Sequence, residues 1–65
     1  MYLAKENKFD VINQRQVAKK VGINEATMCR IVRRKQRCSK MTAYCIVKAI
    51  CELAEIEDYF EKEGE

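Results

Sequence analysis

The fold is decided by residues 14–33, which read QRQVAKKVGINEATMCRIVR. Apolar residues recur in this stretch at three- and four-residue steps, and its single glycine, Gly22, divides it into two halves. Such spacing is typical of amphipathic helices, and a glycine after the last helical turn adopts a left-handed conformation at no steric cost. We therefore predict two short helices, over residues 14–21 and 25–34, joined by a tight turn.

Each predicted helix is preceded by a residue suited to cap it. Asn13 and Asn24 carry short polar side chains that accept hydrogen bonds from the first helical N–H groups, and Gln16 can reach back to Asn13. Ala18 is small enough to let the two helices cross closely. The wedge between them is expected to be filled by Val17, Val21, Ile23, Met28 and Ile31. This arrangement leaves the outer face of the helix over 25–34 free.

The rest of the chain is also expected to be helical, because proline is absent and the alternation typical of strands is weak. We predict a short helix over residues 2–8, with Tyr2, Leu3 and Phe9 turned inward. Residues 33–37, RRKQR, contain no apolar side chain and indicate a basic loop.

A further helix with a wide apolar stripe is expected to begin at Ser39. The stripe consists of Ala43, Ile46, Val47, Ile50, Leu53 and Ala54. The pattern leaves open whether this helix runs unbroken to Phe60 or bends near Glu55. The expected fold class is all-α: a single small domain over residues 1–65 with four to five helices around a central helix-turn-helix.

Composition argues against an enzyme. The 65 residues include no His and only two Gly, so the commonest general base and a phosphate-binding glycine loop are both absent. The four Cys lack the close spacing of zinc ligands, so we expect reduced thiols, no metal and no cofactor, with Cys45 and Cys51 as small core residues. Without a membrane span or a signal-peptide pattern, the expected location is cytoplasmic.

Charge is strongly separated along the chain although the net charge is only +3. Residues 14–40 hold nine basic side chains against Glu25 alone, whereas the end of the chain, 52–65, is acidic. An ordinary solvated face mixes both signs, so this concentration of positive charge favours a polyanionic partner, most simply a nucleic-acid backbone.

The stretch Gln14–Arg33 resembles the lambda-repressor and Cro-like family of helix-turn-helix transcription regulators. The resemblance extends from Asn13 to about Phe60 and includes the following Lys35-Gln36-x-x-Ser39-Lys40. Two positions depart from the family pattern. Arg34 stands where the family commonly has Gly, and Met28 replaces the usual Ile or Val.

The resemblance implies a sequence-specific regulator that binds double-stranded DNA, most simply a phage or bacterial repressor in the bacterial cytoplasm or nucleoid. The helix over 25–34 would read bases in the major groove through Asn24, Glu25, Ala26, Thr27 and Arg30. Phosphate contacts would come from Gln14, Arg15, Arg33, Arg34, Lys35, Arg37 and Lys40. Arg30 suits guanine, while Glu25 could either accept from cytosine or favour the positive end of its helix.

Several alternatives remain open on the sequence. A DNA-binding domain of this size contacts one half-site, so we expect a homodimer. We expect no membrane association and no small-molecule substrate. Tyr59 and Phe60 could form the dimer surface or close the monomer core, and Cys29 could be a redox-sensitive thiol or a tolerated small side chain. The rival functions are a small protein-interaction module, acting as an inhibitor or antirepressor, and an architectural or recombination factor that binds DNA with little sequence preference.

Overall fold

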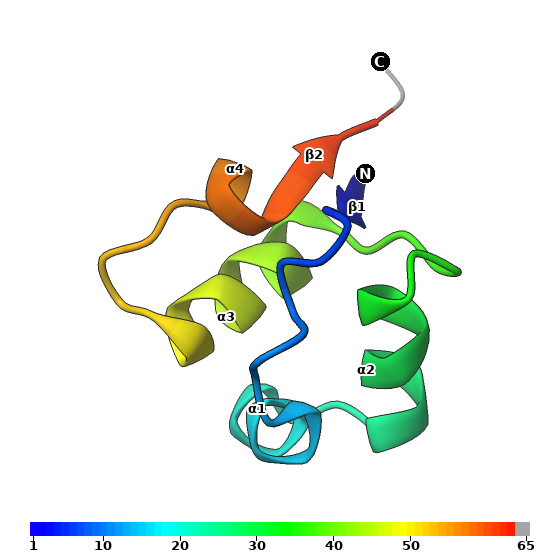
Figure 1. Ribbon diagram of the computed structural model, residues 1–65, viewed down its shortest axis with the longest axis vertical. Helices are drawn as coiled ribbons and strands as arrows, with labels where there is room; N and C mark the ends of the chain where they lie inside the picture. Colours follow the sequence, from blue (N-terminus) through cyan, green and yellow to red (C-terminus); the bar gives the residue numbers. More distant parts are fainter. Residues whose placement is uncertain (64–65) are drawn as a thin grey trace.

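The computed structural model describes residues 1–63, and over these residues it contains four helices and a two-stranded antiparallel sheet (Figure 1). In chain order the elements are β1 (Tyr2–Ala4), α1 (Gln14–Val21), α2 (Glu25–Val32), α3 (Lys40–Ile50), α4 (Ile56–Tyr59) and β2 (Phe60–Lys62). The protein is mostly helical, as predicted. The expectation of an all-α fold is corrected by the sheet.

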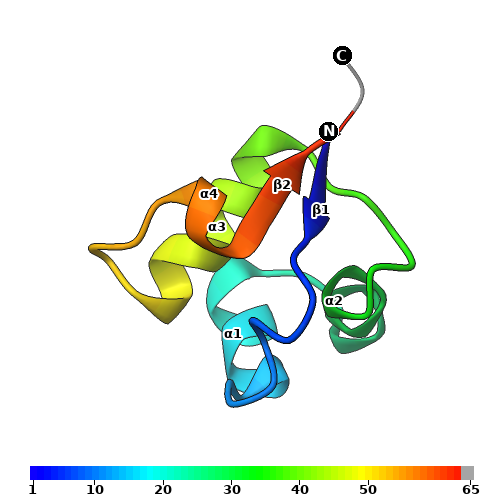
Figure 2. The same cartoon turned by 45° about the horizontal axis from the view of Figure 1, so that its top comes forward.

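The sheet joins the two ends of the chain, where β1 lies beside β2 (Figures 1 and 2). Tyr2 is opposite Lys62 and Ala4 is opposite Phe60, while Tyr2 also exchanges two backbone hydrogen bonds with Cys38, of 2.8 and 2.9 Å. The predicted helix over residues 2–8 is therefore wrong. Three consecutive buried apolar residues do not distinguish a strand from a helix, and pairing with a segment almost 60 residues away decides the outcome.

The caps of α1 and α2 form as the sequence predicts. Asn13 Oδ1 accepts from the Gln16 N–H at 3.2 Å, and Asn24 Oδ1 accepts from the Ala26 N–H at 2.7 Å. Gly22 follows α1 with φ 87°, in the left-handed region. The helix predicted over 25–34 ends two residues earlier, at Val32.

Gly22→Ala should destabilise the protein by about 1–2 kcal/mol, because a Cβ disfavours the left-handed conformation. A Cβ at this position would meet no heavy atom within 4 Å, so the cost comes from the backbone alone. Urea unfolding followed by circular dichroism measures the change. Gly22→Asn is the control, since Asn tolerates positive φ and should lose less stability. An equal loss in both variants would contradict a backbone origin.

The helix that Ser39 caps is shorter than its apolar stripe suggests. The helix begins next to Ser39, as predicted, and the Ser39 hydroxyl accepts from the Thr42 N–H at 3.2 Å, but α3 ends at Ile50. The Lys48 ammonium group then donates to the backbone carbonyls of Glu52 and Ala54, at 2.8 and 3.0 Å, and holds residues 51–55 as a loop. The chain therefore neither runs on as one helix nor merely bends, but forms this loop, α4 and β2.

Two predictions of inward-facing residues fail around this loop. Leu53, placed in the apolar stripe, is 92% exposed because the helix has already ended. Cys45 and Cys51, expected in the core, are both exposed, and Cys38 is buried instead. All four cysteines are free thiols.

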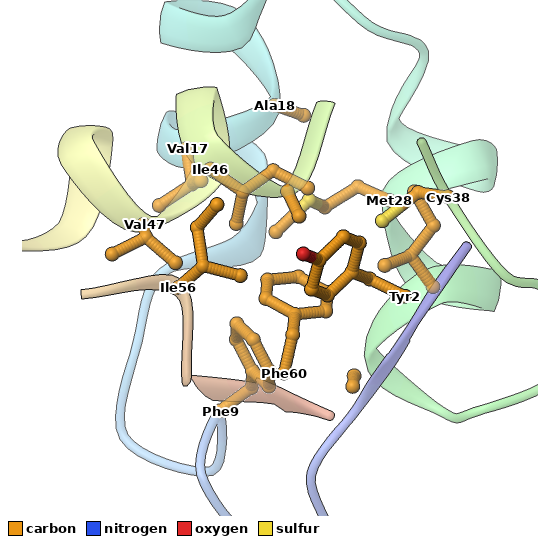
Figure 3. Packing of buried hydrophobic residues seen from close by; sticks show 13 residues of the cluster. Tyr2, Phe9, Val17, Ala18, Met28, Cys38, Ile46, Val47, Ile56 and Phe60 are labelled. Atoms are coloured by element: carbon orange, nitrogen blue, oxygen red, sulfur yellow. The ribbon is translucent and has the colours of Figure 1, made fainter. Parts of the chain in front are cut away.

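Phe60 belongs to the hydrophobic core, and its side chain is fully buried. Its ring meets the Phe9 ring edge-on, with 5.5 Å between centroids, and Figure 3 shows both rings close to Tyr2 and Ile56. From the helices, the side chains packed around them include Val17, Ala18, Met28, Ile31, Ala43, Ile46 and Val47. Of the two interpretations of Phe60, the monomer core is confirmed, while Tyr59 is half-buried at its edge.

Cys38 should react with iodoacetamide much more slowly than Cys45 and Cys51. Burial raises the pKa of the Cys38 thiol from 9.0 to about 11, and only thiolate is nucleophilic. At pH 8 this rise lowers the thiolate fraction about 100-fold. Because the folded-state pKa is raised, the associated stability is complete below pH 9 and declines as the pH approaches 11. Mass mapping of alkylated sites in native and urea-unfolded protein tests the order of reaction; equal native rates would contradict it.

Candidate nucleic-acid interface

Helix α2 has one buried side and one exposed side. Met28 and Ile31 are 0% and 1% exposed, and they hold the helix against the core. Glu25, Ala26 and Arg30 are exposed, and Thr27 is half-buried between the two sides. The five residues expected to read bases, which include Asn24, thus lie at the start of α2 or along its outer part. In Figure 1 this helix forms one flank of the molecule.

The beginnings of α1 and α2 are close together. Arg15 Nε lies 4.0 Å from Glu25 Oε1, with the two side chains 81% and 62% exposed. An ion pair this exposed contributes only about 0–1 kcal/mol, so it does not fix either side chain. Glu25 also lies in the first turn of α2, where a carboxylate is favoured by the helix dipole. Gln14 is half-buried as the first residue of α1.

The end of α2 closes in a hydrogen-bonded pattern usually completed by glycine. The Arg34 N–H donates to the Ile31 carbonyl at 3.1 Å, and the Lys35 N–H donates to the Arg30 carbonyl at 2.9 Å. These two bonds define a Schellman motif, in which the residue after the cap is left-handed. Arg34 occupies that position with φ 64°, a backbone conformation that glycine adopts without steric cost.

Two of the expected phosphate contacts are engaged elsewhere. The Arg34 guanidinium group lies 3.5 Å from a Glu6 carboxylate oxygen and 3.4 Å from one of Glu61. Arg37 Nε donates to Glu63 Oε1 at 2.6 Å. These contacts direct both arginines towards the sheet and its acidic neighbours, and they partly neutralise the basic loop.

Sequence reasoning did not identify these acidic partners. Glu6, Glu61 and Glu63 are 26 to 28 residues from the arginines that they contact. They come near the loop only because β1 and β2 pair beside it. No pattern of neighbouring residues indicates these partners, because their positions depend on the pairing of the two strands, which the sequence does not reveal.

Three further expected phosphate contacts, Arg33, Lys35 and Lys40, are exposed on the surface. Arg33 caps the end of α2, Lys35 follows in the loop, and Lys40 is the first residue of α3. Within residues 1–63, none of these three cations forms an ion pair with a carboxylate. Together with Arg30 they place positive charge around the end of α2 and the loop behind it.

The described part of the chain has no group of three or more Cys, Asp or Glu side chains placed to hold a metal ion. No helix within residues 1–63 is long and apolar enough to cross a membrane. The acidic end expected over 52–65 is described as far as Glu63; Glu65 lies outside the described residues. Comparison of the chain with family models, curated proteins and solved structures found no match.

Proposed function

We propose that this protein is a sequence-specific regulator of transcription that binds double-stranded DNA as a helix-turn-helix, with α2 in the major groove. The proposal rests on the fact that α2 has one buried side and one exposed, basic side. Its apolar side is anchored by fully buried Met28, while its other side exposes Arg30 next to the cations Arg33 and Lys35. A helix that is both rigidly supported and accessible meets the geometric demand of reading base edges.

The proposed contacts divide into base readout and phosphate positioning. Arg30 donates both arms of its guanidinium group to a guanine, and the methyl groups of Ala26 and Thr27 contact thymine. The side-chain oxygen of Asn24, Oδ1, accepts the capping hydrogen bond, which leaves the side-chain NH₂ group to donate to a base. Glu25 serves the positive end of the helix and the Arg15 contact.

Phosphate binding is assigned to the basic side chains at the edges of this face. Gln14 and Arg15 lie at the start of α1, where helix N–H groups also favour anions. Arg33, Lys35 and Lys40 flank the other end. Arg34 and Arg37 reach phosphate only if their carboxylate partners release them, so they contribute less than their charge suggests.

A single copy of this reader covers only one half-site, so we propose that specific binding uses a homodimer. The dimer would place two copies of α2 about one turn of DNA apart. The resemblance to phage and bacterial repressors makes repression in the bacterial cytoplasm or nucleoid the form of regulation to test first.

Selection of bound duplexes from a random pool, followed by sequencing, tests the proposed function. We expect enrichment of a two-fold symmetric site, and retention of that site when unselected duplex is added as competitor. Uniform binding of all duplexes would instead indicate an architectural factor. Absence of binding at low salt would overturn the proposal and favour a module that binds an acidic protein.

A further inference from the structure

The loop over 33–39, between α2 and α3, is held against the sheet. Tyr2 of β1 exchanges two backbone hydrogen bonds with Cys38, of 2.8 and 2.9 Å, and lies opposite Lys62 of β2. Strand β1 therefore runs between the end of this loop and β2, and Figures 1 and 2 show the loop passing beside β1. This arrangement brings the basic side chains of the loop within reach of the carboxylates that border the two strands.

Two arginines of the loop contact these carboxylates. The Arg34 guanidinium group lies 3.5 Å from Glu6 Oε1 and 3.4 Å from Glu61 Oε2. Arg37 Nε donates to Glu63 Oε1 at 2.6 Å. The three carboxylates, which we call the acidic edge, are those of Glu6, Glu61 and Glu63.

The other two cations of the loop have no such contact. Within residues 1–63, neither Arg33 nor Lys35 forms an ion pair with a carboxylate. The run over 33–37 thus contains both cations that are free to bind phosphate and cations whose donors are already occupied. All of them lie next to the exposed side of α2, where the backbone of a bound duplex would pass.

We propose that the acidic edge competes with DNA phosphate for Arg34 and Arg37. Carboxylate and phosphate are bound by the same N–H groups of a guanidinium fork, so a fork turned towards a carboxylate is not available for a two-bond contact with phosphate. Phosphate contacts carry no base information, so the competition lowers the affinity for every duplex by a similar factor. The inference rests on the proposed function and adds an intramolecular contact that limits binding by the same surface.

The exposure of the two arginines sets the size of the effect. The side chains of Arg34 and Arg37 are 38% and 58% exposed, so phosphate can approach both guanidinium groups. Ion pairs between exposed side chains are weak. The acidic edge therefore reduces the affinity by a small factor and does not abolish binding.

Glu57 provides a matched control that separates this contact from a general effect of charge. It is exposed on α4 and forms no ion pair within residues 1–63. In Figures 1 and 2, α4 lies on the side of the sheet away from the loop over 33–39. Glu57→Gln changes the net charge as much as Glu63→Gln does, but it releases no arginine.

Fluorescence anisotropy with a random-sequence duplex, repeated over a series of salt concentrations, tests the competition. At about 0.1 M salt we expect Glu63→Gln to raise the affinity about two- to fivefold. The slope of log K against log salt should become steeper by about 0.9, which corresponds to one added phosphate contact. Glu57→Gln should change the affinity less than about 1.5-fold, because distant charges are screened.

Substituting the arginine identifies the group that is released. In the background of Arg37→Gln, adding Glu63→Gln should change the affinity no more than the control substitution does, since no guanidinium group remains to be freed. Freeing Arg34 requires both Glu6→Gln and Glu61→Gln, and this double variant should show a gain similar to that of Glu63→Gln. Circular dichroism should show an unchanged fold, because Gln has the shape of Glu.

The contact can also be measured without DNA. In nuclear magnetic resonance spectra of the free protein, the Nε–H signal of Arg37 should shift on Glu63→Gln, because the charged acceptor is lost. The same signal should stay in place on Glu57→Gln.

The inference is overturned if Glu63→Gln and Glu57→Gln bind DNA alike, if the gain from Glu63→Gln persists in the Arg37→Gln background, if freeing Arg34 gives no gain, or if the Arg37 signal does not respond. In each of these cases the unaltered chain still binds DNA. Failure of the proposed function is distinguishable, because the unaltered chain and all variants then leave the duplex unbound at low salt, and the inference fails with it.

Discussion

Phe60→Ala is expected to lower the free energy of unfolding by about 3–5 kcal/mol, the range typical of truncating a buried Phe. Phe60 is fully buried, packs edge-on against Phe9, and closes the sheet opposite Ala4. A chain of this length has a total stability of only about 3–10 kcal/mol. The variant should therefore be largely unfolded near physiological temperature, as measured by circular dichroism and urea titration.

Val11→Ala provides the control for this truncation. Val11 is 95% exposed, so its loss should change stability by no more than about 0.5 kcal/mol. A cooperative unfolding transition for Phe60→Ala close to that of Val11→Ala would show that Phe60 does not seal the core. The same result would reopen the interpretation of this residue as part of a dimer surface.

Arg30→Ala is expected to relax base preference at one position of the selected DNA site, at a cost of about 1–3 kcal/mol for the preferred base. The guanidinium group is exposed on α2, and its removal leaves the buried side of the helix untouched. Mobility-shift titrations against the selected duplex and its three variants at that position measure the effect.

Lys35→Ala is the matched control on the phosphate side. Binding should weaken alike for all duplexes, and the slope of log K against log salt should become shallower by about 0.9, which corresponds to one phosphate contact. If Arg30→Ala and Lys35→Ala produced the same uniform loss, the division between base and phosphate contacts would be wrong. Loss of helicity in either variant is checked by circular dichroism.

The elements predicted correctly are those whose ends are set by residues close to them in the sequence. Asn13, Gly22 and Ser39 act through bonds to residues at most four positions away, and all three mark element boundaries as expected. The strands that contain Tyr2 and Phe60 were not predicted, because each pairs with a strand at the opposite end of the sequence. The apolar period also continued to Leu53 past the true end of α3, because the Lys48 contacts that hold the following loop leave no periodic signal.

In the candidate site, too, the features set by neighbouring residues were predictable and those set by distant residues were not. The outer face of α2 follows from helical spacing, so the exposure of Arg30 and the burial of Met28 were predictable. The engagement of Arg34 and Arg37 by carboxylates was not, because it depends on where the sheet places Glu61 and Glu63. Arg34 also adopts a left-handed backbone that its side-chain type disfavours, and only the hydrogen bonds at the end of α2 reveal it.

The pairing of β1 with β2 has a consequence for biosynthesis. Residues 2–4 leave the ribosome early, yet the strand that covers them is translated some 60 residues later. Until Phe60 emerges from the exit tunnel, the nascent chain lacks the aromatic ring that fills the centre of its interior. Helical turns can form on the ribosome from neighbouring residues, but cooperative closure has to wait for contacts of the greatest sequence separation. Closure of the core over residues 1–63 therefore has to wait until Phe60 has left the exit tunnel, and it does not proceed step by step as each helix emerges.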